Sequence, residues 1–142
     1  MIINLIQYQT IDHTADIGIK VFGSDVSDLF KNAGLAMFDL ICEIKDLNKE
    51  ETYHISADGE DWADLIIAWL RELLYLWSGN ELIVNSMDIC SIYPYKICAN
   101  VFCVHFDPGF HAIKHDIKAA TYHNIEVKKT PDGWVANIIF DV

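Results

Sequence analysis

Acidic side chains and a histidine gather in one short segment near the N-terminus. Residues 12–18 have the sequence DHTADIG, so Asp12, His13 and Asp16 stand within five positions. The alternation that follows Asp16 predicts a strand over 16–22, which places this acidic group where a loop enters a strand. Carboxylates at close range repel unless a cation, a donor or water satisfies them, which favours a cation site. The alternative is a solvated turn in which Asp12 or Asp16 caps backbone N–H groups.

A second group of carboxylates is expected at the C-terminus. The apolar strand predicted over 133–141 ends in Asp141, and Val142 follows with its α-carboxylate. Two oxygen ligands on a rigid strand, with Asp16 or Asp12 from a neighbouring strand, would form a site for a hard divalent cation, Mg²⁺, Ca²⁺ or Mn²⁺. The alternative is that Asp141 only solvates the end of its strand.

A third segment places polar side chains inside an otherwise apolar strand. Residues 118–123 have the sequence KAATYH, and strand alternation puts Lys118 and Tyr122 on one face and Thr121 and His123 on the other. Four histidines lie outside these segments, and their spacing matches no zinc-binding pattern. They are expected on the surface or in loops: His54, His105, His111 and His115. A glycine-rich phosphate loop, a GxSxG turn and a Cys–His nucleophile pair are missing from the sequence. The chain is therefore poorly equipped as a stand-alone enzyme.

Two amphipathic helices are expected to support these segments. Apolar residues at three- and four-residue steps predict a helix from Val26 to Ile41, capped by Ser24 or Asp25. Gly34 inside this helix predicts close packing against a neighbour, because glycine weakens a helix interior.

A second helix follows, with apolar residues over more than half of its circumference. Asp58 is predicted to cap it, Asp61 falls in its first turn, and Gly79 is predicted to close it as the residue just after its C-cap. A helix with so wide an apolar surface must be almost completely buried.

The rest of the chain is predicted to form strands. Apolar patterning and turn residues place them over 4–8, 16–22, 53–57, 82–93, 95–106, 114–127 and 133–141, with a charged linker at 43–51. Strand-plus-helix units followed by a run of strands indicate the α+β class, with two helices packed on a largely antiparallel sheet. At 142 residues, the chain is expected to form a single domain over 1–142.

Composition narrows the classes of partner. The formal net charge is −11, from 21 acidic and 10 basic side chains. Such a surface repels phosphate backbones, so direct high-affinity nucleic-acid binding is not expected, whereas cations or a basic protein partner fit it. Uninterrupted apolar runs fall short of the ~18 residues of a membrane span, and the N-terminus lacks the features of a signal peptide, so a cytoplasmic protein without membrane attachment is expected.

The cysteines carry no metal-binding signature. They form no CxxC pair, and strand alternation puts Cys98 and Cys103 on opposite faces. Buried, reduced thiols are therefore expected at all four positions: Cys42, Cys90, Cys98 and Cys103.

Taken together, the three polar segments resemble the archease family. Residues 12–18 resemble its N-terminal signature, residues 118–123 its KAxTYH motif, and residues 140–142 (FDV) its terminal aspartate followed by one aliphatic residue. The motifs occur in the family's order, and the chain length also agrees. The resemblance implies an α+β fold, an archease-like β-sandwich with helices.

Archeases are protein cofactors of the RtcB-type 3′-phosphate RNA ligase, which joins tRNA exons and repairs cleaved RNA. The resemblance implies an accessory protein that promotes guanylylation of the ligase's active-site histidine and so permits multiple turnover and broader nucleotide use. It implies that Asp16 and Asp141 are metal-binding carboxylates, with the Val142 carboxylate as a further ligand.

The other residues of these motifs would support the same region or contact the ligase: Asp12, His13, Lys118, Tyr122 and His123. Two different functions stay open beside the activator. One is a small metal-dependent phosphoester hydrolase using Asp12, Asp16, Asp141 and His123. The other is a structural binding module, in which Asp16 would be replaceable.

Overall fold

Two helices and seven strands make up the part of the chain that the computed structural model describes, residues 7–11, 16–43 and 51–142. Their order along the chain is β1 (Tyr8–Ile11), β2 (Asp16–Gly23), α1 (Val26–Ile41), β3 (Glu51–Asp58), α2 (Trp62–Asn80), β4 (Leu82–Tyr93), β5 (Lys96–His105), β6 (Ala119–Thr130) and β7 (Gly133–Asp141).

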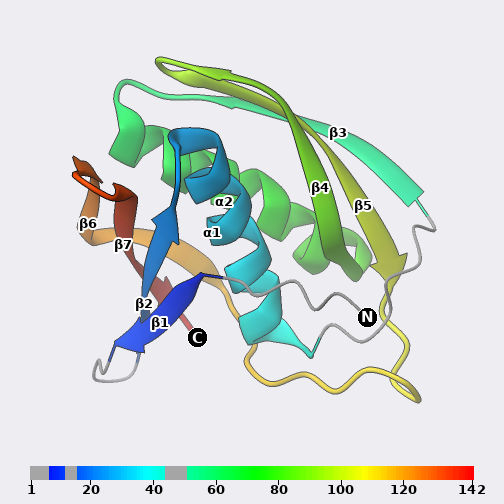
Figure 1. Ribbon diagram of the computed structural model, residues 1–142. Helices are drawn as coiled ribbons and strands as arrows, with labels where there is room; N and C mark the ends of the chain where they lie inside the picture. The colour runs from blue at the N-terminus through cyan, green and yellow to red at the C-terminus, as the bar shows by residue number, and fades with distance from the viewer. Residues whose placement is uncertain (1–6, 12–15, 44–50) are drawn as a thin grey trace.

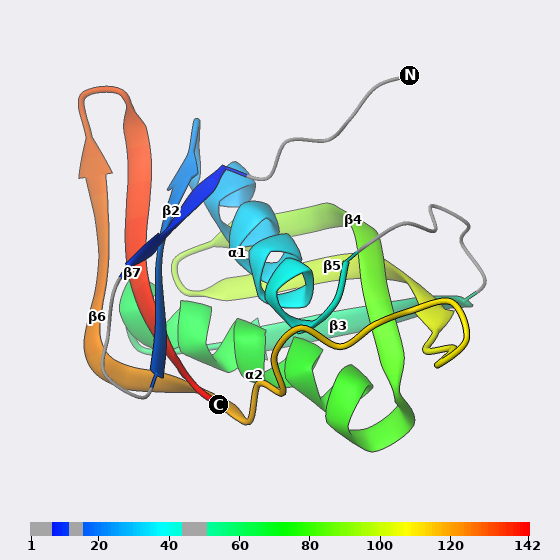
Figure 2. The same ribbon diagram turned by 90° about the horizontal axis from the view of Figure 1, so that it is seen from below.

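The strands divide between two antiparallel sheets, with strand orders β1-β2-β7-β6 and β3-β5-β4. Both helices lie between the sheets (Figures 1 and 2): α1 contacts β2 and β4, and α2 contacts β6 and β3. The α+β class is thereby confirmed, although the strands form two sheets rather than one. The wide apolar surface of α2 explains the second sheet, because a single layer cannot cover both sides of a helix.

Helix α1 follows its sequence pattern closely. Asp25 is the N-cap, and its carboxylate accepts a hydrogen bond from the backbone N–H of Asp28. Gly34 lies where α1 meets α2, and a Cβ there would sit 2.8 Å from Leu73 Cδ1. The predicted close packing at this glycine is therefore confirmed, and the nearby indole N–H of Trp69 donates to the Phe30 carbonyl across the same contact.

Helix α2 differs from its prediction at both ends. Its N-cap is Asp61 rather than Asp58, because Asp58 still belongs to β3 and pairs with Lys96 of β5. Gly79 lies inside the helix, and the left-handed C-cap residue is Glu81, with φ 53°. The exposed Glu81 turns the chain directly into β4.

Most strand predictions hold, but β6 starts late. Strands β4 and β7 have the predicted bounds, whereas β6 begins at Ala119 instead of 114. The preceding segment bonds to the end of α1 instead: Lys114 N–H donates to the Ile41 carbonyl, and Ile113 forms an isolated bridge with Cys42. The predicted strand 4–8 and linker 43–51 fall largely outside the described residues, and β1 covers Tyr8–Ile11.

The cysteine prediction is correct for only part of the set. All four thiols are free, and Cys42 and Cys103 are buried, but Cys90 is exposed and Cys98 is half-buried. Cys90 lies at a register shift of β4 between Ile89 and Ser91, where the alternation that would bury it is broken. Of the helices described here, neither combines the length and the apolar character needed to cross a membrane.

Candidate metal site at the end of β2 and β7

Two carboxylates face each other where β2 begins and β7 ends. The antiparallel register puts Asp16 directly opposite Asp141 and Ile17 opposite Phe140. Side chains directly opposite in such a pair leave the same face of the sheet with their Cβ atoms about 5 Å apart. The two carboxylates that the sequence placed at opposite ends of the chain are therefore neighbours.

The start of the KAATYH segment adjoins this pair from the other side. Ala119 of β6 pairs with Asp141, and the Lys118 N–H donates to the Asp141 carbonyl at 2.8 Å. Asp141 and Lys118 are exposed, and Val142 is 43% exposed. Figure 1 shows the C-terminus beside the end of the sheet at which β2 begins. Segments from three parts of the chain thus meet at one accessible edge.

The chemistry of this edge suits a hard cation. Like charges directly opposite in a sheet destabilise it, and a divalent cation between them would remove that repulsion. The donors are carboxylate oxygens, which Mg²⁺, Ca²⁺ and Mn²⁺ prefer. In the described residues, His, Cys, Asp and Glu side chains form no group of three or more that could hold a metal, so the pair offers a partial ligand set. Asp12 and His13 lie outside the described residues.

The second half of the KAATYH segment does not reach the carboxylate pair. Thr121 pairs with Ile139, but the next paired residue of β6 is Glu126, opposite Asn137. Residues 122–125 therefore bulge out of the ladder, and the regular pairing on which the predicted alternation of Tyr122 and His123 depends is interrupted there. Both side chains are exposed.

Tyr122 bonds instead to helix α2, through two residues that sequence patterns did not single out. Its hydroxyl donates to Asp64 Oδ1 at 2.8 Å, and the Arg71 guanidinium lies over its ring at 5.5 Å from the centroid. The Asp64 bond raises the pKa of Tyr122. Hydrogen bonds from the Glu60 N–H and from Tyr122 lower the pKa of Asp64. The only available sequence signal was the seven-residue spacing of Asp64 and Arg71, which puts them on one helix face.

His111 lies in a loop, as the sequence predicts, but it is buried there. It lies in the loop after β5 but is only 8% exposed, and its Nδ1 accepts a hydrogen bond from the Asp107 N–H at 2.9 Å. Its ring stacks on Phe106 and meets Phe110 edge-on. With Nδ1 engaged and aromatic rings around it, His111 is a structural residue of this loop.

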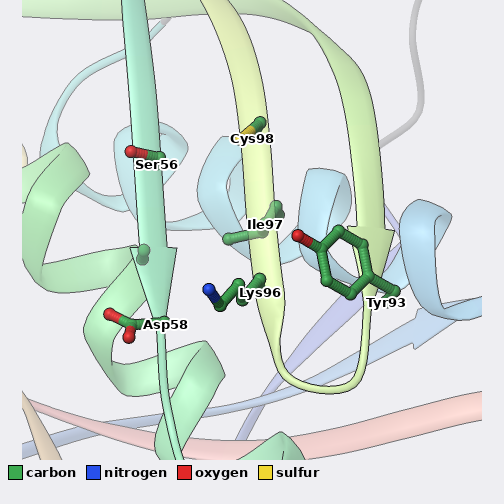
Figure 3. A pocket seen from close by; sticks show the side chains of 7 residues that line it. Ser56, Asp58, Tyr93, Lys96, Ile97 and Cys98 are labelled. Carbon is green, nitrogen blue, oxygen red and sulfur yellow. The ribbon is translucent and has the colours of Figure 1, made fainter.

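A separate shallow pocket of about 340 Å³ lies on the outer face of the three-stranded sheet (Figure 3). Ser56 and Asp58 of β3, Lys96 and Cys98 of β5, and Tyr93 of β4 line it. Its lining mixes one cation, one anion and neutral groups, and it belongs to the other sheet from Asp16 and Asp141. It therefore adds nothing to the carboxylate pair.

Fold and site together define a small α+β protein with two helices between antiparallel sheets and paired carboxylates at an open sheet end. The sequence profile of the Archease protein family matches residues 8–142. "Protein archease" of Methanosarcina barkeri is 34% identical over 140 residues, which cover 96% of each chain. "Protein archease" of Pyrococcus furiosus is 32% identical, with 96% of this chain and 99% of that one covered. The chain belongs to the archease family.

A solved structure supports the fold independently. The solution structure of protein 1598 from Methanobacterium thermoautotrophicum matches with a TM-score of 0.84 at 24% identity. The match covers 97% of this chain and 100% of the other. The arrangement of two helices and two antiparallel sheets is thus shared with that protein. The family inferred from the three sequence motifs is confirmed by the family profile and by the archease relatives.

Proposed function

We propose that this protein is an accessory activator of an RtcB-type 3′-phosphate RNA ligase in tRNA splicing and RNA repair. It would promote guanylylation of the ligase and its repeated turnover without catalysing a reaction of its own, and it would act in the cytoplasm. Membership of the archease family supports this proposal. The observation that carries it is the pairing of Asp16 with Asp141 at an exposed sheet end.

In this proposal, Asp16 and Asp141 hold a divalent cation, Ca²⁺, Mg²⁺ or Mn²⁺. The α-carboxylate of Val142, and Asp12 and His13 of the preceding loop, are proposed as additional or supporting groups. A cation so held would neutralise negative charge on a nucleotide triphosphate and on its leaving pyrophosphate. The β2–β7 ladder keeps the two carboxylates in place, since a paired strand fixes the direction of its side chains.

Lys118 and His123 are proposed to contact the ligase. Lys118 is exposed and its backbone N–H is bonded to the Asp141 carbonyl, so this cationic residue adjoins the end of β7 that carries Asp141. An acidic protein of net charge −11 also suits a partner with a basic surface rather than direct contact with RNA.

The test is a time course of covalent guanylate addition to a purified RtcB-type ligase, with and without this protein. Wild type should accelerate the labelling, and Asp16→Ala and Asp141→Ala should lose most of the acceleration. Asp132→Ala is the matched control, because Asp132 is exposed in the turn at the opposite end of β7. Full acceleration by both site variants would contradict the metal role, and no acceleration by wild type would contradict the activator.

The hydrolase alternative is tested on the protein alone. It requires His123 to act with Asp16 and Asp141, whereas His123 follows Thr121 into the bulge and away from the Ala119–Asp141 pair. Phosphoester turnover by the isolated protein, lost in both Asp16→Ala and His123→Ala, would replace the activator proposal. We expect no such turnover.

A further inference from the structure

The bulge in β6 interrupts the segment that carries Tyr122 and His123. Five steps of β6, from Thr121 to Glu126, oppose only two steps of β7, from Ile139 to Asn137. Asn124 takes up a left-handed conformation within it, at φ 53°. Figure 2 shows β6 bending strongly part-way along its length. Residues 122–125 therefore lack the ladder that orients side chains in a regular strand.

One side of the bulge is tied to β7 by a threonine. The Thr121 hydroxyl donates to the Ile139 carbonyl at 3.0 Å, and the same oxygen accepts from the His123 N–H at 3.3 Å. These bonds fix where the bulge starts. They leave the direction of the Tyr122 side chain to its other contacts.

A second hydrogen bond connects the bulge, through Tyr122, to helix α2. The Tyr122 hydroxyl bonds to Asp64 Oδ1, while Asp64 Oδ2 accepts from the Glu60 N–H at 2.9 Å. The Asp64 N–H in turn donates to Asp61 Oδ1 at 2.7 Å. Asp64 is thus locked by the helix cap, and it gives Tyr122 a rigid acceptor.

Arg71 completes the contact two helical turns further on. Its guanidinium lies over the Tyr122 ring, so the ring is held at its hydroxyl by an anion and on its face by a cation. Tyr122 nevertheless stays 50% exposed. A side chain clamped at two points and open to solvent is an oriented surface group, because core packing does not account for it.

We propose that Asp64 and Arg71 are positioning residues that hold the 122–125 bulge in one conformation, so that Tyr122 and His123 are presented to the ligase in a fixed orientation. The presentation to the ligase rests on the proposed function, and the clamp itself does not. Neither α2 residue touches the carboxylate pair, which distinguishes this role from metal binding.

The experiment combines two measurements on Tyr122→Phe, which removes the hydroxyl and keeps the ring, and on Arg71→Ala. Amide hydrogen exchange followed by NMR reports the bulge without the ligase. The concentration of protein that gives half-maximal ligase guanylylation reports the interaction, and the maximal rate is measured separately. Tyr75→Phe is the matched control, because Tyr75 is an exposed tyrosine on α2, the helix that carries Asp64 and Arg71.

We expect both variants to accelerate exchange at 122–125 and leave the amides of β7 at the Asp141 end unchanged. The half-maximal concentration should rise about three- to tenfold, as for the loss of one hydrogen bond, with the maximal rate kept. Asp64→Ala removes the acceptor, so adding Tyr122→Phe to it should have no further effect, since the two groups form one bond.

Unchanged exchange at 122–125 in Tyr122→Phe would overturn the clamp, whatever the ligase does. Faster exchange with an unchanged half-maximal concentration would overturn the presentation to the ligase. If wild type fails to activate the ligase at all, the proposed function fails and the presentation fails with it, while the exchange data still decide the clamp. A purely structural role would lower thermal stability without moving the half-maximal concentration.

Discussion

Asp16 and Asp141 are a register pair, so their side chains leave the same face of the sheet as close neighbours. Each residue stands out in the sequence, one as the second aspartate of DHTADIG and the other as the last charge before the chain end. Like charges directly opposite each other are expected to weaken a ladder, and this expectation can be tested without any partner protein.

Neutralising one of the two carboxylates should stabilise the metal-free protein. In the presence of a chelator, Asp141→Asn should raise the free energy of unfolding by about 0.5 kcal/mol, as expected when a like-charge cross-strand pair is relieved. Calcium should stabilise wild type and not the variant, because binding to the folded state alone adds stability. Urea unfolding with and without calcium measures both effects. Lower stability of Asp141→Asn in the chelator would contradict the repulsion.

The residue types of the site were predictable from sequence, and their contacts were predictable only in part. The pairing of Asp16 with Asp141 joins two strands that lie far apart in the sequence, and local patterning does not specify such a distant register. The partner of Tyr122 was missed for a related reason. Asp64 looks like an ordinary polar residue of α2, and a bulge that no alternation pattern indicates brings Tyr122 to it.

Among the helices and strands, both ends of α1 were predicted correctly, whereas neither end of α2 was. Asp58 and Asp61 are equally good caps by residue type, and the extent of β3 decides between them. Gly79 matched the common glycine after a helix, but the chain turns at Glu81 instead. Element existence and type follow from apolar periodicity, whereas the ends depend on what the neighbouring strand requires.

Two glycine substitutions test whether Gly79 is an ordinary position inside α2, with the crowded Gly23 as the contrast. Gly79→Ala should stabilise the protein by about 0.5–1 kcal/mol, because Gly79 is in an open helix position with nothing within 4 Å of an added Cβ. Gly23→Ala should destabilise it by about 2–3 kcal/mol, since its Cβ would lie 2.3 Å from the Leu29 backbone nitrogen. Urea unfolding compares the two. Destabilisation by Gly79→Ala would show that the helix ends at the glycine after all.

The free energy of unfolding that is lost at acid pH should depend on Asp64 in the first turn of α2. Hydrogen bonds from the Glu60 N–H and Tyr122 lower the pKa of Asp64 below its ordinary 3.8 in the folded protein. A carboxyl whose pKa is depressed on folding stabilises the protein above its unfolded pKa, and this stabilisation is lost as pH falls through the folded value. Asp64→Asn should therefore lose less stability between about pH 6 and pH 3 than wild type does. Parallel urea series at both pH values, with Asp132→Asn as control, measure the difference; equal losses in all three proteins would contradict the prediction.

At the scale of the whole molecule, two sheets enclose the two helices, and that enclosure governs which side chains solvent reaches. The wide apolar surface of α2 predicted its burial, but the number of sheets could not be deduced from strand patterns, since strand pairing is non-local. The cysteines report this enclosure directly, because they differ in exposure while sharing one chemistry.

Thiol labelling of the native protein should follow burial. Cys90 is exposed, whereas burial raises the pKa of Cys42 and raises that of Cys103 to about 12. Since the thiolate is the nucleophile, a maleimide at about pH 8 should modify Cys90 quickly and should reach Cys42 and Cys103 only on unfolding. Mass spectrometry of timed digests identifies the labelled positions. Labelling of Cys103 as fast as Cys90 in folded protein would contradict the enclosed core.

The proposed metal role requires that Asp16 at the start of β2 and Asp141 at the end of β7 hold one cation together. Calorimetric titration of Ca²⁺, Mg²⁺ and Mn²⁺ into wild type, Asp16→Asn, Asp141→Asn and Asp132→Asn tests it most directly. We expect one site for at least one of these cations in wild type and in Asp132→Asn, and its loss in either of the other two variants. Equal binding by all four proteins, or no binding by wild type, would contradict it.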